Sequence, residues 1–166
     1  MAPKYTIVDS PLGALTVVAD DGALTGLYFP HHWTRPDRTS FGLRDDVAFD
    51  EVTRQLKEYF AGERREFDLP TRAEGDQFDR SVWAEIAKIP YGETATYGDI
   101  ATALHDPTAA RAVGAAVGRN PLSILVACHR VVGKNGVLTG YAGGLQRKRH
   151  LLELEQPAPE ERGQLW

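Results

Sequence analysis

The chain has 166 residues, enough for one large or two small domains with a buried core, and a net charge of −4 at neutral pH. Its 42% hydrophobic and 25% charged residues are usual for a globular protein, and no apolar run is long enough to span a bilayer. The single cysteine excludes an internal disulfide and a multi-cysteine zinc site, and a lone thiol suits a reducing compartment, so we expect a cytoplasmic protein with no metal and no membrane contact.

The beginning of the chain is predicted to be rich in β-strands. Short strand-like runs lie at residues 5–8, 15–18 and 24–29. The segments between them, Ser10–Gly13 and Asp20–Gly22, carry turn signals. Three short strands separated by turns indicate that the first part of the chain is rich in β-structure.

A helix is predicted to follow the strands and to complete an α+β domain over residues 1–70. Between residues 46 and 61 apolar side chains recur at helical spacing: Phe49, Val52, Leu56 and Tyr59. The irregular stretch before this helix contains His31 and His32, which we expect at the surface because no cysteine is available to complete a metal site. Proline and glycine favour a linker at 71–75.

Residues 76–156 are predicted to form a mostly helical second domain, followed by a tail at 157–166. A first helix is indicated by an apolar stripe that ends before Pro90: Phe78, Val82, Ile86 and Ile89. The tail contains two prolines and is a poor helix candidate.

A helix-turn-helix is predicted next. Thr96 is expected to cap a helix over residues 97–104. Asp106 and Pro107 have the pattern of an N-cap followed by the first residue of a second helix, which would run to Gly118. Such helix pairs also occur in proteins that never touch DNA. The second helix could therefore pack closely against a neighbour or enter a groove of DNA.

The distribution of charge favours the DNA-binding alternative. Residues 1–106 carry a net charge of −8 and residues 151–166 a net charge of −3. Residues 107–150 contain no acidic residue and have a net charge of +7, from Arg111, Arg119, Arg130, Lys134, Arg147, Lys148 and Arg149. A basic block of this kind indicates a polyanionic partner. Arg111 is the one long side chain among the small residues of the predicted second helix.

The only cysteine lies inside this basic block. Cys128 follows an apolar run and is followed directly by His129, Arg130 and Val131. A thiol is a strong nucleophile only as a thiolate, and a nearby imidazole is a common means of removing its proton. A nucleophile among DNA-binding features suggests a reaction on DNA.

Nearly the whole chain resembles the O6-alkylguanine-DNA alkyltransferases, a family of methylated-DNA–protein-cysteine methyltransferases. The resemblance is carried by short motifs distributed in order along the chain: Asp9–Gly13, Tyr91–Glu93, Thr96-Tyr97, Ala109–Gly114, Asn120-Pro121, Cys128–Val131, Gly140–Leu145, Lys148 and Leu151–Glu155. It implies an α+β fold with a ribonuclease-H-like sheet-and-helix domain and a mostly helical domain with a helix-turn-helix. Non-catalytic relatives lack the cysteine that is present here.

The resemblance implies that Cys128 removes the alkyl group from O6 of guanine in a single turnover, without a cofactor. His129 would act as the base through a bound water, and Glu155 would orient the imidazole. Tyr97 would donate to the leaving guanine. Asn120 would connect the turn after the second helix of the predicted pair to the segment that carries the cysteine.

The resemblance also implies how the substrate is held. The partner would be double-stranded DNA containing O6-alkylguanine, with O4-alkylthymine as a second candidate lesion, and the damaged base would be flipped out of the duplex. The substrate-binding residues would be Val131, Tyr141, Ala142 and Gly143. The DNA-binding residues would be Ala110, Arg111, Gly114, Arg119 and Arg130, with Arg111 filling the space that the flipped base leaves.

Two departures and two alternatives accompany this interpretation. Ala127 stands where the family usually has proline, which frees the backbone before the cysteine. The cysteine zinc site found in the N-terminal domain of some relatives is absent. A DNA-binding regulator with a structural Cys128 would bind without alkyl transfer, and a cysteine hydrolase using Cys128, His129 and Glu155 would turn over an acyl substrate.

Overall fold

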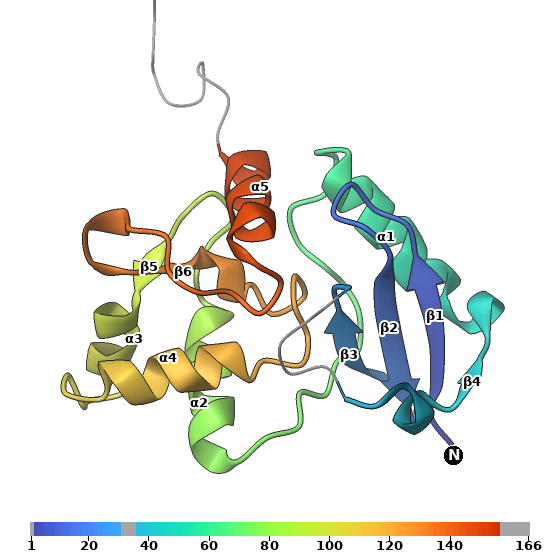
Figure 1. Ribbon diagram of the computed structural model, residues 1–166, viewed down its shortest axis with the longest axis horizontal. Coiled ribbons are helices and arrows are strands. Elements are labelled where there is room, and N and C mark those ends of the chain that lie inside the picture. The colour runs from blue at the N-terminus through green and yellow to red at the C-terminus, as the bar shows by residue number, and fades with distance from the viewer. Residues whose placement is uncertain (1, 31–35, 157–166) are drawn as a thin grey trace, which may run out of the picture.

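The computed structural model describes residues 2–30 and 36–156 (Figure 1), so the predictions for His31, His32 and the tail at 157–166 lie outside the described residues. The first half of the chain is a sheet with one long helix. The sheet has the strand order β3-β2-β1-β4, with the bounds β1 Lys4–Val8, β2 Leu15–Asp20, β3 Ala23–Tyr28 and β4 Leu43–Arg44. The three predicted strands correspond to β1, β2 and β3.

The turns of this sheet follow from its sequence. Strands β1 and β2 pair antiparallel, and so do β2 and β3. Between β2 and β3, Asp21 and Gly22 have positive φ angles of 51° and 82°, which suit a tight hairpin turn. Strand β4 pairs parallel with β1 over two residues only. A strand of two residues is too short to show the alternation of apolar and polar side chains by which strands are predicted from sequence.

The long helix α1 (Asp50–Phe60) packs on one face of the sheet. Its buried residues Val52, Leu56 and Tyr59 join the main core. The predicted helix at 46–61 begins with a separate 3₁₀ turn, η2 (Asp46–Phe49), capped by Asp45. The opposite face of the sheet has a small cluster of its own, in which Tyr28 stacks on Phe41.

The second half is mostly helical, as predicted, with α2 Gln77–Ile86, α3 Tyr97–Ala103, α4 Ala110–Gly118 and α5 Leu145–Glu155. It also contains two short strands that the sequence pattern did not indicate, β5 (Ala95–Thr96) and β6 (Val131–Val132). They pair parallel, so that Thr96 lies opposite Val132. This pairing attaches the segment that follows Cys128 to the start of the helix pair.

The prediction for the helix pair is correct at one end and wrong at the other. Thr96 caps α3 in a full capping box with Asp99, as its position indicated. Helix α4 begins at Ala110, so Asp106 is not its N-cap. The Asp106 carboxylate instead accepts hydrogen bonds from the backbone and hydroxyl of Thr108 and closes a turn before the helix.

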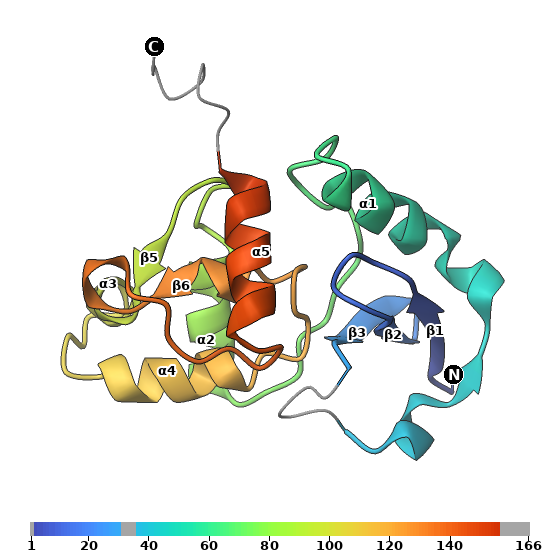
Figure 2. The same cartoon turned by 45° about the horizontal axis from the view of Figure 1, so that its top comes forward.

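Both halves contribute to one continuous core, which contains residues of β2, α1, α2 and α4. Strand β3 joins the halves by backbone hydrogen bonds, since the N–H of Leu27 donates to the carbonyl of Pro121 and that of Arg72 to Leu24. Helix α5 stands at the junction (Figure 2). Within the described part of the chain, no helix is long and apolar enough to cross a membrane.

Candidate active site

Cys128 begins a 3₁₀ turn, η3 (Cys128–Arg130), and only 2% of its surface is exposed. The preceding segment is tightly bent. Ile124 has a φ of 71°, a left-handed conformation that is uncommon for a β-branched residue. Ala127 has a φ of −78°, within the range that proline imposes, so alanine holds here the conformation that the family's proline would fix.

Asn120 holds this bend in place. The residue is buried, and its amide Nδ2 donates to the carbonyl of Val126 at 2.9 Å, while its Oδ1 accepts from the backbone of Leu122 at 3.0 Å. The side chain therefore joins the end of α4 to the residues just before Cys128.

His129 and Glu155 form a buried pair. The distance from His129 Nε2 to Glu155 Oε2 is 2.8 Å, and neither residue has appreciable exposed surface. An ionised carboxylate can only accept, so Nε2 carries the proton of the neutral imidazole. The other ring nitrogen, Nδ1, is buried without a hydrogen-bond partner among the described residues, which leaves it available to accept a proton.

Two further side chains hold Glu155. Arg130 donates from Nε to Oε1 at 2.7 Å and from Nη2 to Oε2 at 3.0 Å. The hydroxyl of Tyr59, on α1, donates to Oε2 at 2.5 Å. Burial alone would raise the pKa of Glu155, but the hydrogen bonds from His129, Arg130 and Tyr59 lower it to about 2. The carboxylate is therefore ionised at neutral pH.

The thiol and the imidazole are both shifted toward their neutral forms. Burial raises the pKa of Cys128, and contacts with the amide of Asn120, the hydroxyl of Tyr141 and the charge of Lys148 offset this in part. Burial lowers the pKa of His129, against the opposing effect of Glu155. The resting pair is therefore a thiol and a neutral imidazole, so the sulfur needs a base at the moment of reaction.

Lys148 is a buried cation close to this site. Its ammonium group donates to the carbonyl of Thr139 at 3.2 Å. Burial lowers its pKa to about 8, and the sulfur of Cys128 acts in the opposite direction. In the sequence, Lys148 belongs only to a family motif, whereas in the fold its charge interacts with the sulfur of Cys128.

The predicted substrate-binding residues lie in the interior, and one of them, Tyr141, interacts with Cys128. Val131, Tyr141, Ala142 and Gly143 are all buried. The Tyr141 hydroxyl interacts with Cys128 and Ser123, although it forms no well-aligned hydrogen bond to a described residue. A side chain on Gly143 would collide with the ring of Phe29 at 2.4 Å, so packing alone already demands glycine there.

Tyr97 is the first residue of α3. Its hydroxyl is 2.6 Å from Oγ1 of Thr139, in the loop that also contacts Lys148. Its ring faces α4 at Gly114, where an added methyl group would make only an ordinary contact with it. Internal packing therefore does not require glycine at position 114.

The predicted DNA-binding residues divide into two groups. Arg111 is exposed on α4 beside the small Ala110, and no described residue forms an ion pair or hydrogen bond with its side chain. Arg119 is paired with the carboxylate of Asp79, with Nη2 and Oδ1 2.6 Å apart. Arg130 points inward to Glu155 and to the carbonyl of Ile89. These bonds favour a structural role for Arg119 and Arg130 over a phosphate contact.

The basic block offers fewer outward charges than the sequence suggested. Besides Arg119 and Arg130, Arg147 donates to three backbone carbonyls and Lys148 is buried. Three cations of the block remain exposed with no side-chain hydrogen bond or ion pair to a described residue: Arg111, Lys134 and Arg149.

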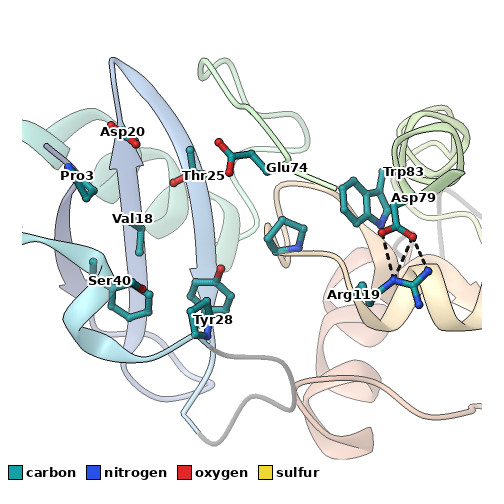
Figure 3. A pocket seen from close by; sticks show the side chains of 13 residues that line it. Pro3, Val18, Asp20, Thr25, Tyr28, Ser40, Glu74, Asp79, Trp83 and Arg119 are labelled. Atoms are coloured by element: carbon teal, nitrogen blue, oxygen red, sulfur yellow. Dashed lines mark hydrogen bonds and ion pairs between the residues drawn. The ribbon is translucent and has the colours of Figure 1, made fainter. Parts of the chain in front are cut away.

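The cavity drawn in Figure 3 is not the active site. It has a volume of about 590 Å³ and lies between the outer face of the sheet and the helices α2 and α4. Its lining includes Tyr28, Trp83 and the Asp79–Arg119 pair, but not Cys128. Within residues 2–30 and 36–156, no group of three or more His, Cys, Asp or Glu side chains is placed to hold a metal ion.

Tyr59 is a residue of the candidate site that the sequence analysis did not single out. Its spacing on α1 gave it the signature of an ordinary core residue. The contact with Glu155 joins residues 96 positions apart, and no local pattern could have indicated it.

The structure combines a buried cysteine, the next residue His129 in a buried pair with Glu155, and the helix pair α3 and α4. Two family models match the chain: the ribonuclease-like domain of 6-O-methylguanine DNA methyltransferase over residues 4–73, and the DNA-binding domain of the same family over residues 77–157. The chain belongs to the O6-methylguanine-DNA methyltransferase family, and the predicted fold class is thereby confirmed.

Individual relatives agree with this membership. The methylated-DNA–protein-cysteine methyltransferase of Mycolicibacterium paratuberculosis is 48% identical over 153 residues, 92% of each chain. That of Methanosarcina acetivorans is 45% identical over 151 residues, 91% of this chain and 97% of the relative. The solved structure of Mycobacterium tuberculosis OGT in complex with DNA superimposes with a TM-score of 0.87, at 48% identity and 92% coverage of both chains.

Proposed function

We propose that this protein is a methylated-DNA–protein-cysteine methyltransferase that repairs O6-methylguanine by moving the methyl group to its own Cys128. The observation that carries the assignment of the acceptor is the arrangement behind the buried thiol. His129 donates through Nε2 to the ionised Glu155 and keeps Nδ1 unprotonated. The assignment of the reaction is supported by relatives that are 48% identical over 92% of the chain and are described as methylated-DNA–protein-cysteine methyltransferases.

The reaction begins with removal of the thiol proton. His129 Nδ1 accepts the proton of Cys128 through a bridging water, and Glu155 stabilises the imidazolium that forms. The sulfur attacks the alkyl carbon in line, so that the S–C bond forms as the C–O6 bond breaks. The electron pair remains on guanine, which takes up a proton. We assign that donation to the hydroxyl of Tyr97.

The backbone around the thiol is assigned to recognition of the base. Val131 directly follows the 3₁₀ turn that begins at Cys128, and Ala142 directly follows Tyr141. The next residue, Gly143, packs against the ring of Phe29. A base inside a duplex cannot reach a buried thiol and must be flipped out, at a cost of a few kcal/mol. Arg111 on α4 is the side chain that we assign to the vacated space.

The thioether product is stable in water, so each molecule reacts once. We place the protein in the cytoplasm, because a free thiol that must remain reduced suits that compartment. The DNA complex of the mycobacterial relative supports DNA as the partner.

Mass spectrometry after mixing with methylated duplex DNA tests the proposal. We expect a stable gain of one methylene mass on the Cys128 peptide, and no gain in Cys128→Ser, which should still bind the duplex. Binding without any mass gain in the wild type would favour a DNA-binding regulator. Release of an acyl product from a test ester, with no alkyl transfer, would favour a hydrolase.

A further inference from the structure

Tyr59 connects the N-terminal half of the protein to the active site. Among the described residues it is the only side chain of the first seventy residues that bonds to Glu155, through the 2.5 Å contact between its hydroxyl and Oε2. The C-terminal ends of α1 and α5 lie toward each other in both views (Figures 1 and 2). The ring is buried and packs against Phe60, Phe67 and Tyr91, so the hydroxyl has a fixed position.

The hydroxyl bonds to the same oxygen that holds the imidazole. Oε2 accepts from Tyr59, from His129 at 2.8 Å and from Arg130 at 3.0 Å, and Oε1 accepts from Arg130 at 2.7 Å. Four donor groups from three residues bond to this carboxylate, three of them to Oε2 and one to Oε1, and together they hold its orientation. Without the hydroxyl, Oε2 loses one of the bonds that fix its direction toward His129.

We propose that Tyr59 is a positioning residue for alkyl transfer: its hydroxyl fixes Glu155 and, through Glu155, the tautomer and orientation of His129. This inference rests on the proposed function. Its consequence is that the sheet-and-helix half contributes a group to the chemistry.

The direction of proton donation agrees with this role. Burial raises the pKa of Tyr59 above its ordinary value, and the neighbouring Glu155 raises it further. The phenol therefore remains protonated and donates, while Glu155 is ionised. A donor that cannot itself ionise at working pH is suited to holding a carboxylate in one orientation.

Tyr59→Phe tests the proposal, because phenylalanine keeps the ring and its packing and removes only the hydroxyl. We expect single-turnover methyl transfer to fall about tenfold, both from duplex DNA and from free O6-methylguanine base, the usual order for losing one bond to a charged group. Affinity for unmodified duplex should not change. The ¹⁵N NMR spectrum of His129 should change from one Nε2–H tautomer to a mixture.

Tyr91→Phe is the matched control. Tyr91 packs edge-on against Tyr59, and its hydroxyl donates to the backbone carbonyl of Leu154 at 3.2 Å rather than to the Glu155 carboxylate. This variant should keep the transfer rate and the single His129 tautomer.

Three results would overturn the proposal: a wild-type rate and tautomer in Tyr59→Phe, an equal loss in Tyr91→Phe, or a Tyr59→Phe protein that does not fold, which would assign the hydroxyl to stability. Failure of the proposed function is distinct, since wild-type protein itself would then gain no mass on Cys128.

Discussion

At Cys128, burial opposes the reaction that we assign to the sulfur. The thiolate is the reactive form, yet removal from water raises the pKa of the thiol. The same burial lowers the pKa of His129, so that the imidazole is neutral and can accept a proton at neutral pH. The resting site therefore holds a protonated thiol beside a neutral imidazole that can act as its base.

The rate of alkyl transfer is expected to fall in acid with a midpoint below pH 6.5. The folded pKa of His129 lies below its ordinary value of 6.5, so the imidazole gains a proton only at lower pH, and a protonated imidazole cannot act as the base. Single-turnover rates between about pH 5 and about pH 8 would measure this, with circular dichroism to verify folding at each pH. A midpoint at or above 6.5 would contradict the assignment of His129.

Among the helices, α3 and α4 show which local signals are reliable. At the start of α3 the side chains of Thr96 and Asp99 each accept a hydrogen bond from the backbone N–H of the other residue. This capping pattern can be recognised from the local sequence alone, without knowledge of the fold. The pair Asp106-Pro107 has the same local appearance, but Asp106 bonds with Thr108 and the helix starts three residues after Pro107, at Ala110. An aspartate that can close a turn or cap a helix cannot be assigned from spacing alone.

Arg111 on α4 gives a prediction for this element. Arg111→Ala should slow repair in duplex DNA more than reaction with free O6-methylguanine base, because only the duplex must lose stacking when a base is flipped, at a few kcal/mol. Rates with both substrates would measure the difference.

Arg111→Lys controls for the charge, since it keeps a phosphate contact while changing the shape of the side chain. Equal slowing of both substrates by Arg111→Ala would remove Arg111 from the flipping role and assign it to the fold or the pocket.

For the molecule as a whole, the sequence predicted the fold class, the three long strands and the helical second half. Those elements follow from hydrophobic period and turn residues. The strands β4, β5 and β6 have two residues each, too few for a sequence pattern to predict them. Of the candidate site, the Cys128 and His129 motif was recognisable in the sequence. The convergence of Tyr59 and Arg130 on Glu155 was not, because it depends on contacts between distant segments.

The salt dependence of DNA binding is a property of the whole charge distribution. Arg111, Lys134 and Arg149 are the cations of the basic block that remain exposed without side-chain partners among the described residues. Each phosphate contact contributes about −0.9 to the slope of log affinity against log salt, so we expect a slope of about −3. Binding titrations at several salt concentrations would measure it, with Arg149→Ala reducing the slope by about one.

A slope of log affinity against log salt of about −6 would mean that all seven cations of the basic block contact phosphates. Arg119, Arg130, Arg147 and Lys148 would then have to release their internal partners on binding DNA. A flat titration, or strong preference for one unmodified sequence, would contradict the assignment to damaged duplex DNA.

The close packing around Cys128 has a consequence for the molecule after it has reacted. A methyl group added to a sulfur that is only 2% exposed enlarges a side chain inside a filled interior, where extra carbon atoms typically cost about 1–3 kcal/mol. We therefore expect the spent protein to unfold more readily than the fresh one, so that its resistance to unfolding would report whether it has been used.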